Sequence, residues 1–328
     1  MQTFYFILQI TIIYSKINKT STRRFAEIFD SEVVMAKAKK IPFLSTVAIL
    51  LAASLWGCIG IFSRDMAENG FSVVQTVSIR ALLTAVIMFI AICIKGPSLL
   101  KIRFRDIWMF LGTGICSFLF FNICYMTAIN EASLSVAGIL LYTSPFWVLL
   151  LSAPIFGEKI TVVKLVAITI CFGGSALLVF GAHLSWSLKG LVFGLLAGLG
   201  YALYSIFGKI AVRRYHSFTI TFYTFLFAFI GTLPICDFKG LVTLMATPHN
   251  IYSSLGIAVV NTVLPYVLYT YGLKRINAGK ASVIAIIEPV AAAVVGHFLF
   301  DEYITTIGII GIVAVFLGLL LLENTSKR

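Results

Sequence analysis

Long apolar segments, separated by short polar stretches, fill most of this chain. Each holds about 20 residues, enough for a helix to cross the ~30 Å hydrocarbon core of a bilayer. The segments are continuously apolar rather than alternating, which favours membrane helices over the strands of a membrane barrel. The pattern predicts ten spans, which lie near residues 43–63, 72–94, 107–129, 133–156, 161–182, 188–209, 216–235, 251–273, 280–300 and 303–322.

The second half of the chain repeats the first at an offset of 144 residues, which pairs Pro145 with Pro289. The run Glu158-Lys159-Ile160-Thr161 corresponds in the same way to Glu302-Tyr303-Ile304-Thr305. Because each half holds an odd number of helices, the second half enters the membrane from the opposite side. We therefore predict an all-α integral membrane protein with ten transmembrane helices in two inverted five-helix repeats, an architecture of secondary transporters.

The repeat sets the expected domain organisation. It consists of a cytoplasmic N-terminal segment at residues 1–42, a first repeat at 43–182, a second repeat at 188–322 and a cytoplasmic tail at 323–328.

Composition and charge agree with a membrane protein and argue against a nucleic-acid partner. The chain is 60% hydrophobic and only 12% charged, whereas soluble domains carry about 25% charged residues. From Lys37 onward, every Lys and Arg outside the span interiors lies on one side of the membrane, except Arg64, Lys189 and Lys239. The net charge of +12 is therefore a topology signal. The positive-inside rule places both termini in the cytoplasm of a multi-pass cell-membrane protein.

Residues 1–34 do not follow this pattern. The apolar stretch Phe4–Tyr14 is too short to span a membrane, and the basic n-region of a signal peptide is missing. Met35 opens the run Met-Ala-Lys-Ala-Lys-Lys directly before the first span. We predict that translation begins at Met35, with an amphipathic tail on the membrane surface as the alternative. The intact mass of the native protein separates the two.

Short motifs occur along the chain, and the last two of them correspond to each other in the two repeats. They are Leu55-Trp56-Gly57, Ser78-Ile79-Arg80-Ala81-Leu82-Leu83, Tyr142-Thr143-Ser144-Pro145 with Phe156-Gly157-Glu158-Lys159-Ile160-Thr161, and Ile287-Glu288-Pro289-Val290 with Phe300-Asp301-Glu302. Over residues 43–322 this pattern resembles the drug/metabolite transporter superfamily, in particular its EamA-type ten-helix members. The resemblance implies two inverted five-helix repeats and transport of small organic metabolites, often as export.

Two ionisable residues, Arg80 and Glu288, lie deep within spans. A charge at this depth costs at least ~2.5 kcal/mol and is retained where it has a partner or a water-filled cavity. Three roles stay open. The two side chains form a structural ion pair, or Arg80 binds a substrate carboxylate or phosphate. In the third, Glu288 carries a coupling proton or binds a substrate amine, because apolar surroundings favour a neutral carboxyl group.

Pro145 and Pro289 lie near mid-membrane in equivalent spans. Proline lacks an N–H and clashes with the preceding turn, so each is expected to break its helix and free backbone carbonyls for a substrate. A static kink that improves packing is the alternative. Glu288 lies directly before the second proline, which favours a functional site there.

Aromatic and amide side chains are candidates for a cavity wall. Trp56, Asn122, Tyr125 and Tyr269 lie within spans and together suit recognition of a ring or a cation. Ordinary core packing is the alternative for each. At the span ends, Glu158 and its repeat mate Glu302 fit helix-capping or loop-anchoring roles.

The glycines at positions 190, 194 and 198 form one flat helix face. Such a face serves close helix packing within the chain or the seam of a homodimer, and both remain open.

The sequence contains neither a G-x-x-x-x-G-K-[ST] phosphate loop nor an H-E-x-x-H zinc motif. We therefore predict no enzyme activity, no cofactor and no metal. The predicted function is secondary active export, by alternating access, of a small-molecule substrate such as an amino acid or a similar zwitterionic or amphiphilic solute. The expected partners are that substrate, the lipid bilayer and a proton or other coupling ion. The alternatives are a nucleotide-sugar or phosphometabolite exchanger and a non-transporting receptor or helper subunit.

Overall fold

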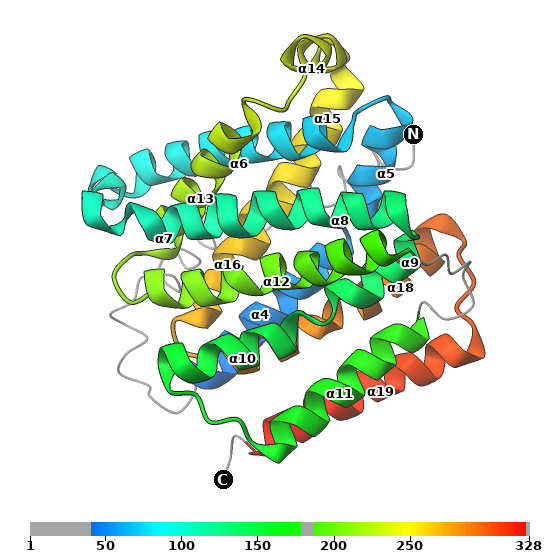
Figure 1. Ribbon diagram of the computed structural model, residues 1–328. Coiled ribbons are helices and arrows are strands. Elements are labelled where there is room, and N and C mark those ends of the chain that lie inside the picture. The colour runs from blue at the N-terminus through cyan, green and yellow to red at the C-terminus, as the bar shows by residue number, and fades with distance from the viewer. Residues whose placement is uncertain (1–40, 179–186, 326–328) are drawn as a thin grey trace, which may run out of the picture. The chain divides into compact units, whose positions relative to one another are not determined.

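A computed structural model describes residues 41–178 and 187–325, and these ranges are almost entirely helical (Figure 1). The expectation about residues 1–34 lies outside them. The first repeat contains α4 (Ile41–Gly57), α5 (Gly60–Glu68), α6 (Val73–Lys95), η1 (Pro97–Leu100), η2 (Phe104–Asp106), α7 (Ile107–Leu111), η3 (Gly112–Leu119), α8 (Phe120–Glu131), α9 (Leu134–Leu141), α10 (Ser144–Phe156) and α11 (Val162–Leu178). The second contains α12 (Leu188–Ala211), α13 (Ser217–Thr232), α14 (Phe238–Met245), α15 (Pro248–Ala258), η4 (Val259–Val263), α16 (Leu264–Leu273), α17 (Ala278–Ile284), η5 (Ala285–Ile287), α18 (Glu288–Phe300) and α19 (Thr306–Thr325).

Ten apolar helical segments occur in the described ranges, at the positions of the ten predicted spans. Seven are long and apolar enough to cross a membrane by themselves. The other three are shorter, and they are Val162–Leu178, Ser217–Thr232 and Thr306–Leu322. The prediction of an all-α membrane protein with ten transmembrane helices is confirmed.

The connection between the seventh and eighth spans is more ordered than a short loop. It contains α14, which begins after Asp237, and the Asp237 carboxylate accepts a hydrogen bond from the Gly240 N–H at 3.1 Å. An aspartate in this position satisfies a backbone donor that the first turn of a helix leaves free.

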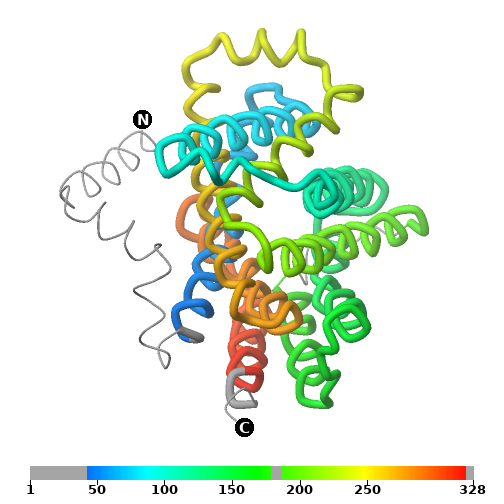
Figure 2. Tube along the Cα trace, turned by 90° about the vertical axis from the view of Figure 1, so that its left-hand side faces the viewer, coloured from blue at the N-terminus to red at the C-terminus, as the bar shows by residue number. Residues whose placement is uncertain are grey.

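The last helix of each repeat, α11 and α19, packs against the other along its length (Figure 1 and Figure 2). A Cβ added at Gly174 would lie 2.6 Å from the carbonyl oxygen of Gly311 and 2.9 Å from the N atom of Val315. A Cβ added at Gly318 would meet the carbonyl oxygen of Ala167, at 2.9 Å, and the backbone of Cys171. These contacts are reciprocal at an offset of 144 residues. They also run in opposite directions along the two helices, which is what inverted repeats require.

Two further helices show matched irregularities. The segments η3 and η4 are π-helical, and η4 occupies the position in the second repeat that corresponds to the end of η3. Within them, Ser117 donates to the carbonyl oxygen of Gly200 at 2.7 Å, and Asn261, its equivalent, donates to that of Leu55. Each π segment therefore binds the backbone of the first helix of the other repeat.

The glycine face of α12 packs within the protein, against the end of α8 and against α9. A Cβ at Gly190 would lie 2.7 Å from that of Ala132, and one at Gly194 would lie 2.8 Å from that of Leu140. Of the two alternatives for this face, the structure shows the intramolecular one.

Candidate functional site

The fourth helix of each repeat is interrupted in mid-span. In the first repeat α9 ends at Leu141 and α10 begins at Ser144, with Pro145 in its first turn. In the second repeat α17 ends at Ile284, η5 follows, and Pro289 lies in the first turn of α18. Both prolines begin a new half-helix, where their missing N–H costs nothing.

Glycines on the first helix of each repeat bring backbone against these breaks. A Cβ at Gly57 would lie 2.5 Å from the carbonyl oxygen of Glu288 and 2.7 Å from the Cβ of Ala291. A Cβ at Gly198 would lie 2.6 Å from Oγ1 of Thr143. In both repeats, the first helix thus packs on the broken helix of the other repeat.

Glu288 lies at the second break and has a tyrosine as its direct partner. Tyr201, on α12, donates its hydroxyl hydrogen to Oε2 of Glu288 at 2.7 Å. Tyr125 and Tyr142 also lie near enough to interact electrostatically with this carboxylate. Glu288 nevertheless keeps part of its surface accessible. The arrangement is a carboxyl group deep in the protein, surrounded by phenols from three helices.

Arg80 does not form an ion pair with Glu288. Its Nε donates to Oγ1 of Thr262 at 2.6 Å, and its Nη2 donates to the carbonyl oxygen of Asn261 at 3.2 Å. Its guanidinium also lies 5.1 Å from the centre of the Phe118 ring. Arg80 is 5% exposed, and it ties α6 to the irregular backbone of η4. The structural ion pair considered from the sequence is absent from this conformation.

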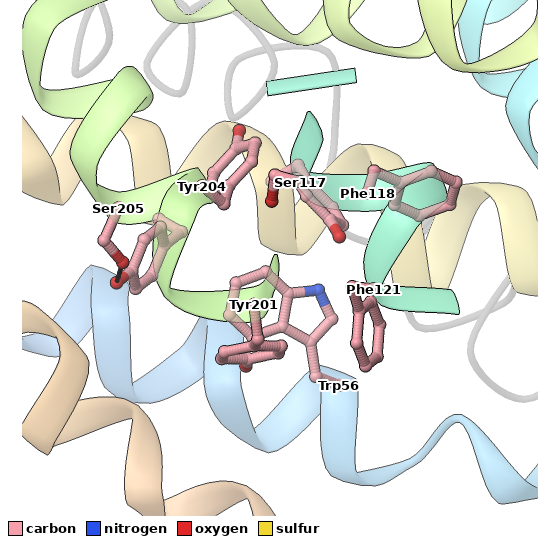
Figure 3. Close-up of a pocket in the computed structure, with 9 residues that line it drawn as sticks. Trp56, Ser117, Phe118, Phe121, Tyr201, Tyr204 and Ser205 are labelled. Carbon is pink, nitrogen blue, oxygen red and sulfur yellow. Dashed lines mark hydrogen bonds between the residues drawn. The ribbon is translucent and has the colours of Figure 1, made fainter. Parts of the chain in front are cut away.

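An aromatic pocket lies beside the Glu288 carboxyl group, and in this conformation its free interior of about 10 Å³ has room for roughly one water molecule. It is lined by Trp56, Ser117, Phe118, Phe121, Tyr201, Tyr204, Ser205, Tyr266 and Tyr269. Figure 3 shows the Trp56 indole between Tyr201 and Phe121, with its ring nitrogen turned toward the helix that carries Ser117. Both repeats contribute residues, and Tyr201 joins the pocket to Glu288.

The predicted cavity-wall residues separate into three groups. Trp56 and Tyr269 line the pocket, and the Tyr269 hydroxyl bonds that of Ser205 at 2.7 Å. Tyr125 lies near Glu288 instead. Asn122 does neither, because its amide nitrogen donates to the carbonyl oxygen of Phe118 at 2.7 Å on its own helix. That local bond uses one of the two amide hydrogens, and a cavity-wall role of Asn122 stays a prediction.

Sequence reasoning missed the tyrosines of α12. Tyr201 and Tyr204 line the pocket together with Ser205. Their three- and four-residue spacing places them on one helix face. That stripe was the available signal, but it is hidden among the many aromatic residues of the chain.

The two glutamates that follow the broken helices have different partners. Glu158 accepts from the N–H of Ala278 at 2.9 Å and from that of Gly279 at 3.2 Å, so it caps α17 and ties α10 to it. Glu302 instead pairs with Arg64 at 2.6 Å. Glu158 therefore joins the two half-helices α10 and α17, whereas its repeat equivalent Glu302 binds Arg64 instead.

Comparison with known proteins identifies relatives along almost the whole described chain. A profile of the EamA-like transporter family matches residues 44–180 and again residues 188–323. An uncharacterized transporter of Archaeoglobus fulgidus is 30% identical over 275 residues, covering 84% of this chain and 94% of that protein. The uncharacterized transporter YxxF of Bacillus subtilis is 27% identical over 290 residues, covering 84% and 88%.

A solved crystal structure has a similar fold. It superposes with a TM-score of 0.69 at 14% sequence identity, and the match covers 87% of this chain and 98% of that one. At this identity the likeness concerns the fold alone.

Proposed function

The chain belongs to the EamA-like transporter family, and from this premise we propose that it exports small organic solutes, amino acids or similar zwitterions, across the cell membrane. The proposal includes cytoplasmic termini, alternating access and proton coupling at Glu288. The observation that carries it is the Glu288 carboxyl group, which lies at a helix break, bonds Tyr201 and adjoins a pocket that both repeats line. Transporters of inverted repeats bind their solutes at such discontinuous helices.

The charges around the pocket favour an amine-bearing solute over a phosphorylated one. The Glu288 carboxyl group has one hydrogen bond from the protein, so it has acceptor capacity left for a substrate ammonium or a proton. Phosphate recognition ordinarily uses several basic groups. Arg80 is a single guanidinium, and two of its nitrogens already donate to Thr262 and Asn261.

The unequal glutamate contacts support alternating access. Glu158 holds α10 and α17 together on one side, while its equivalent Glu302 pairs with Arg64 on the other. The two repeats share a sequence pattern but make different contacts. We take this asymmetry to represent one of the two states of the transport cycle, in which one side of the protein is closed and the other is open. Loss of the Glu158 contacts with α17, together with formation of the equivalent contact between Glu302 and α9, would open the first side and close the second.

The test is solute uptake by the purified protein in liposomes that carry a pH gradient, measured with a panel of labelled amino acids and phosphorylated solutes. We expect the wild type to accumulate at least one of them. We expect Glu288→Gln to lower gradient-driven accumulation about ten-fold or more, since the amide cannot exchange the coupling proton. Glu131→Gln is the matched control, because Glu131 lies at a helix end and pairs with Lys189 at 2.5 Å.

Full gradient-driven accumulation by Glu288→Gln would remove the coupling role. Accumulation of phosphorylated solutes but of no amino acid would replace the proposed substrate class.

A further inference from the structure

One donor in the aromatic pocket has no acceptor. Trp56 is 7% exposed, and its Nε1 is buried without a hydrogen-bond partner. The indole is held from three sides, with ring centres 6.0 Å from Tyr201, 5.1 Å from Tyr266 and 5.2 Å from Tyr269. The N–H is therefore a fixed donor, and leaving it unsatisfied costs free energy that a bound acceptor would recover.

Of the hydroxyl groups that line the pocket, all but that of Tyr266 have hydrogen-bond partners other than this donor. Tyr204 bonds Thr270 at 2.9 Å, and Tyr269 bonds Ser205 at 2.7 Å. Ser117 donates to the carbonyl oxygen of Gly200. Tyr201 donates to Glu288. The pocket thus combines apolar ring faces, the unused Trp56 N–H, the Tyr266 hydroxyl and, across Tyr201, the Glu288 carboxyl group.

We propose that the Trp56 N–H binds an acceptor oxygen of the transported solute and so selects solutes that carry a carboxylate or carbonyl group next to an apolar ring. This inference rests on the proposed transport function. It adds to Glu288 a second polar anchor, of opposite hydrogen-bonding character, on the other side of Tyr201. In a conformation that opens this pocket more widely, a solute with an ammonium group, a carboxylate and a flat apolar body would have Glu288, Trp56 and the ring faces as its partners.

Three probes of nearly equal shape test the assignment, and they are phenylalanine, 3-phenylpropionate and 2-phenylethylamine. Binding is measured by ligand-dependent thermal stabilisation of the purified protein, wild type and Trp56→Phe. We expect Trp56→Phe to weaken the binding of the two carboxylates about ten-fold, which is the usual effect of losing a hydrogen bond to a charged group. The amine has no oxygen, and its affinity should stay within about two-fold.

A tryptophan analogue with sulfur in place of the indole N–H, introduced at position 56, separates the hydrogen bond from ring packing. It should reproduce the selective loss while keeping the melting temperature of the free protein. Trp108→Phe is the control, because Trp108 is 47% exposed and packs against Phe207 outside the pocket. It should change none of the three affinities.

The role of the N–H would be overturned if both Trp56 variants weakened the binding of all three probes equally. It would also be overturned if they weakened the binding of none. Failure of the wild type to bind either carboxylate would have the same consequence. Glu288→Gln in the same assay tests the proposed function separately, because this change should weaken the binding of 2-phenylethylamine and leave the binding of 3-phenylpropionate unchanged. A selective loss in the Trp56 variants with no effect of Glu288→Gln would sustain this inference while contradicting the role of Glu288.

Discussion

Among single residues, glycines set how closely the helices approach the two breaks. Gly57 and Gly198 lie where backbone atoms of the fourth and ninth spans come nearest to the first helix of the other repeat. A methyl group at either position would meet backbone or side-chain atoms closer than van der Waals contact allows. Their contribution is therefore the space they leave, which brings the site residues together.

Gly57→Ala is expected to destabilise the protein. The new Cβ would lie 2.5 Å from the Glu288 carbonyl oxygen, and such overpacking costs about 1–3 kcal/mol. We expect the apparent melting temperature in detergent to fall by several degrees, with transport reduced because the Glu288 backbone moves.

Gly173→Ala is the matched control for this change. No atom would lie within 4 Å of its Cβ, and alanine is the better helix former. A melting temperature of Gly57→Ala equal to that of the control would contradict the packing argument.

The sequence provides the type of each residue and its depth in a span, and this information was enough to predict some of the residues of the site. Glu288 and the two prolines stand out because a charge or a proline is costly within an apolar helix. Tyr142 and Tyr201 carry no such signal, since a tyrosine is ordinary in a membrane helix. The bond of Asn122 to its own helix could not be foreseen, because it depends on a side-chain rotamer that spacing does not reveal.

At the level of elements, the positions of the spans could be predicted from the thickness of the bilayer. The irregular segments of the helices could not be predicted. An apolar run of fixed length marks a span. A π segment such as η4 differs from an α-helix only by one hydrogen-bond register. Nothing in the composition of Val259–Val263 distinguishes the two. The α14 helix was missed for another reason, because eight residues are too few to give a periodic pattern.

The cap formed by Glu158 makes a prediction about the α10–α17 contact. Removing it in Glu158→Ala leaves the N–H groups of Ala278 and Gly279 without their acceptor, at a cost of about 0.5–2 kcal/mol. A cysteine placed at Ser282, which is 5% exposed in α17, should then react about two- to thirty-fold faster with a water-soluble maleimide. The measurement uses a protein whose native cysteines are replaced.

Glu302→Ala serves as the control at the equivalent position. It removes a half-exposed surface pair with Arg64, which contributes little to stability. Equal reaction rates at position 282 in the two variants would contradict a specific role of Glu158.

Across the whole unit from Ser45 onward, the α11–α19 contact defines the relation between the repeats. Cys171 and Val315 are equivalent residues, and the Cys171 Sγ lies 3.6 Å from the Val315 carbonyl oxygen. Residues related in this way meet only next to the axis that interchanges the two halves. The helix pair is therefore the place where the internal symmetry can be tested directly.

Val315→Cys is expected to form a disulfide with the native Cys171 under mild oxidation. The product would link α11 to α19, and mass spectrometry of proteolytic fragments would show the two cysteines in one linked peptide. Val313→Cys, at a position that is 52% exposed, is the control and should stay unlinked to Cys171. Linkage of position 313 in preference to position 315 would contradict the register of the helix pair.

The reciprocal α11–α19 contact also bears on how such a protein can arise. Both halves of this surface are present in a single five-helix segment, so two copies inserted in opposite directions could form it as a dimer of identical subunits. Fusion into one polypeptide fixes the ratio at one to one and lets each copy change by itself. The matched positions Ser144 and Glu288 show what that freedom permits. Identical subunits would carry two carboxylates at this depth or none, and the fused chain carries one.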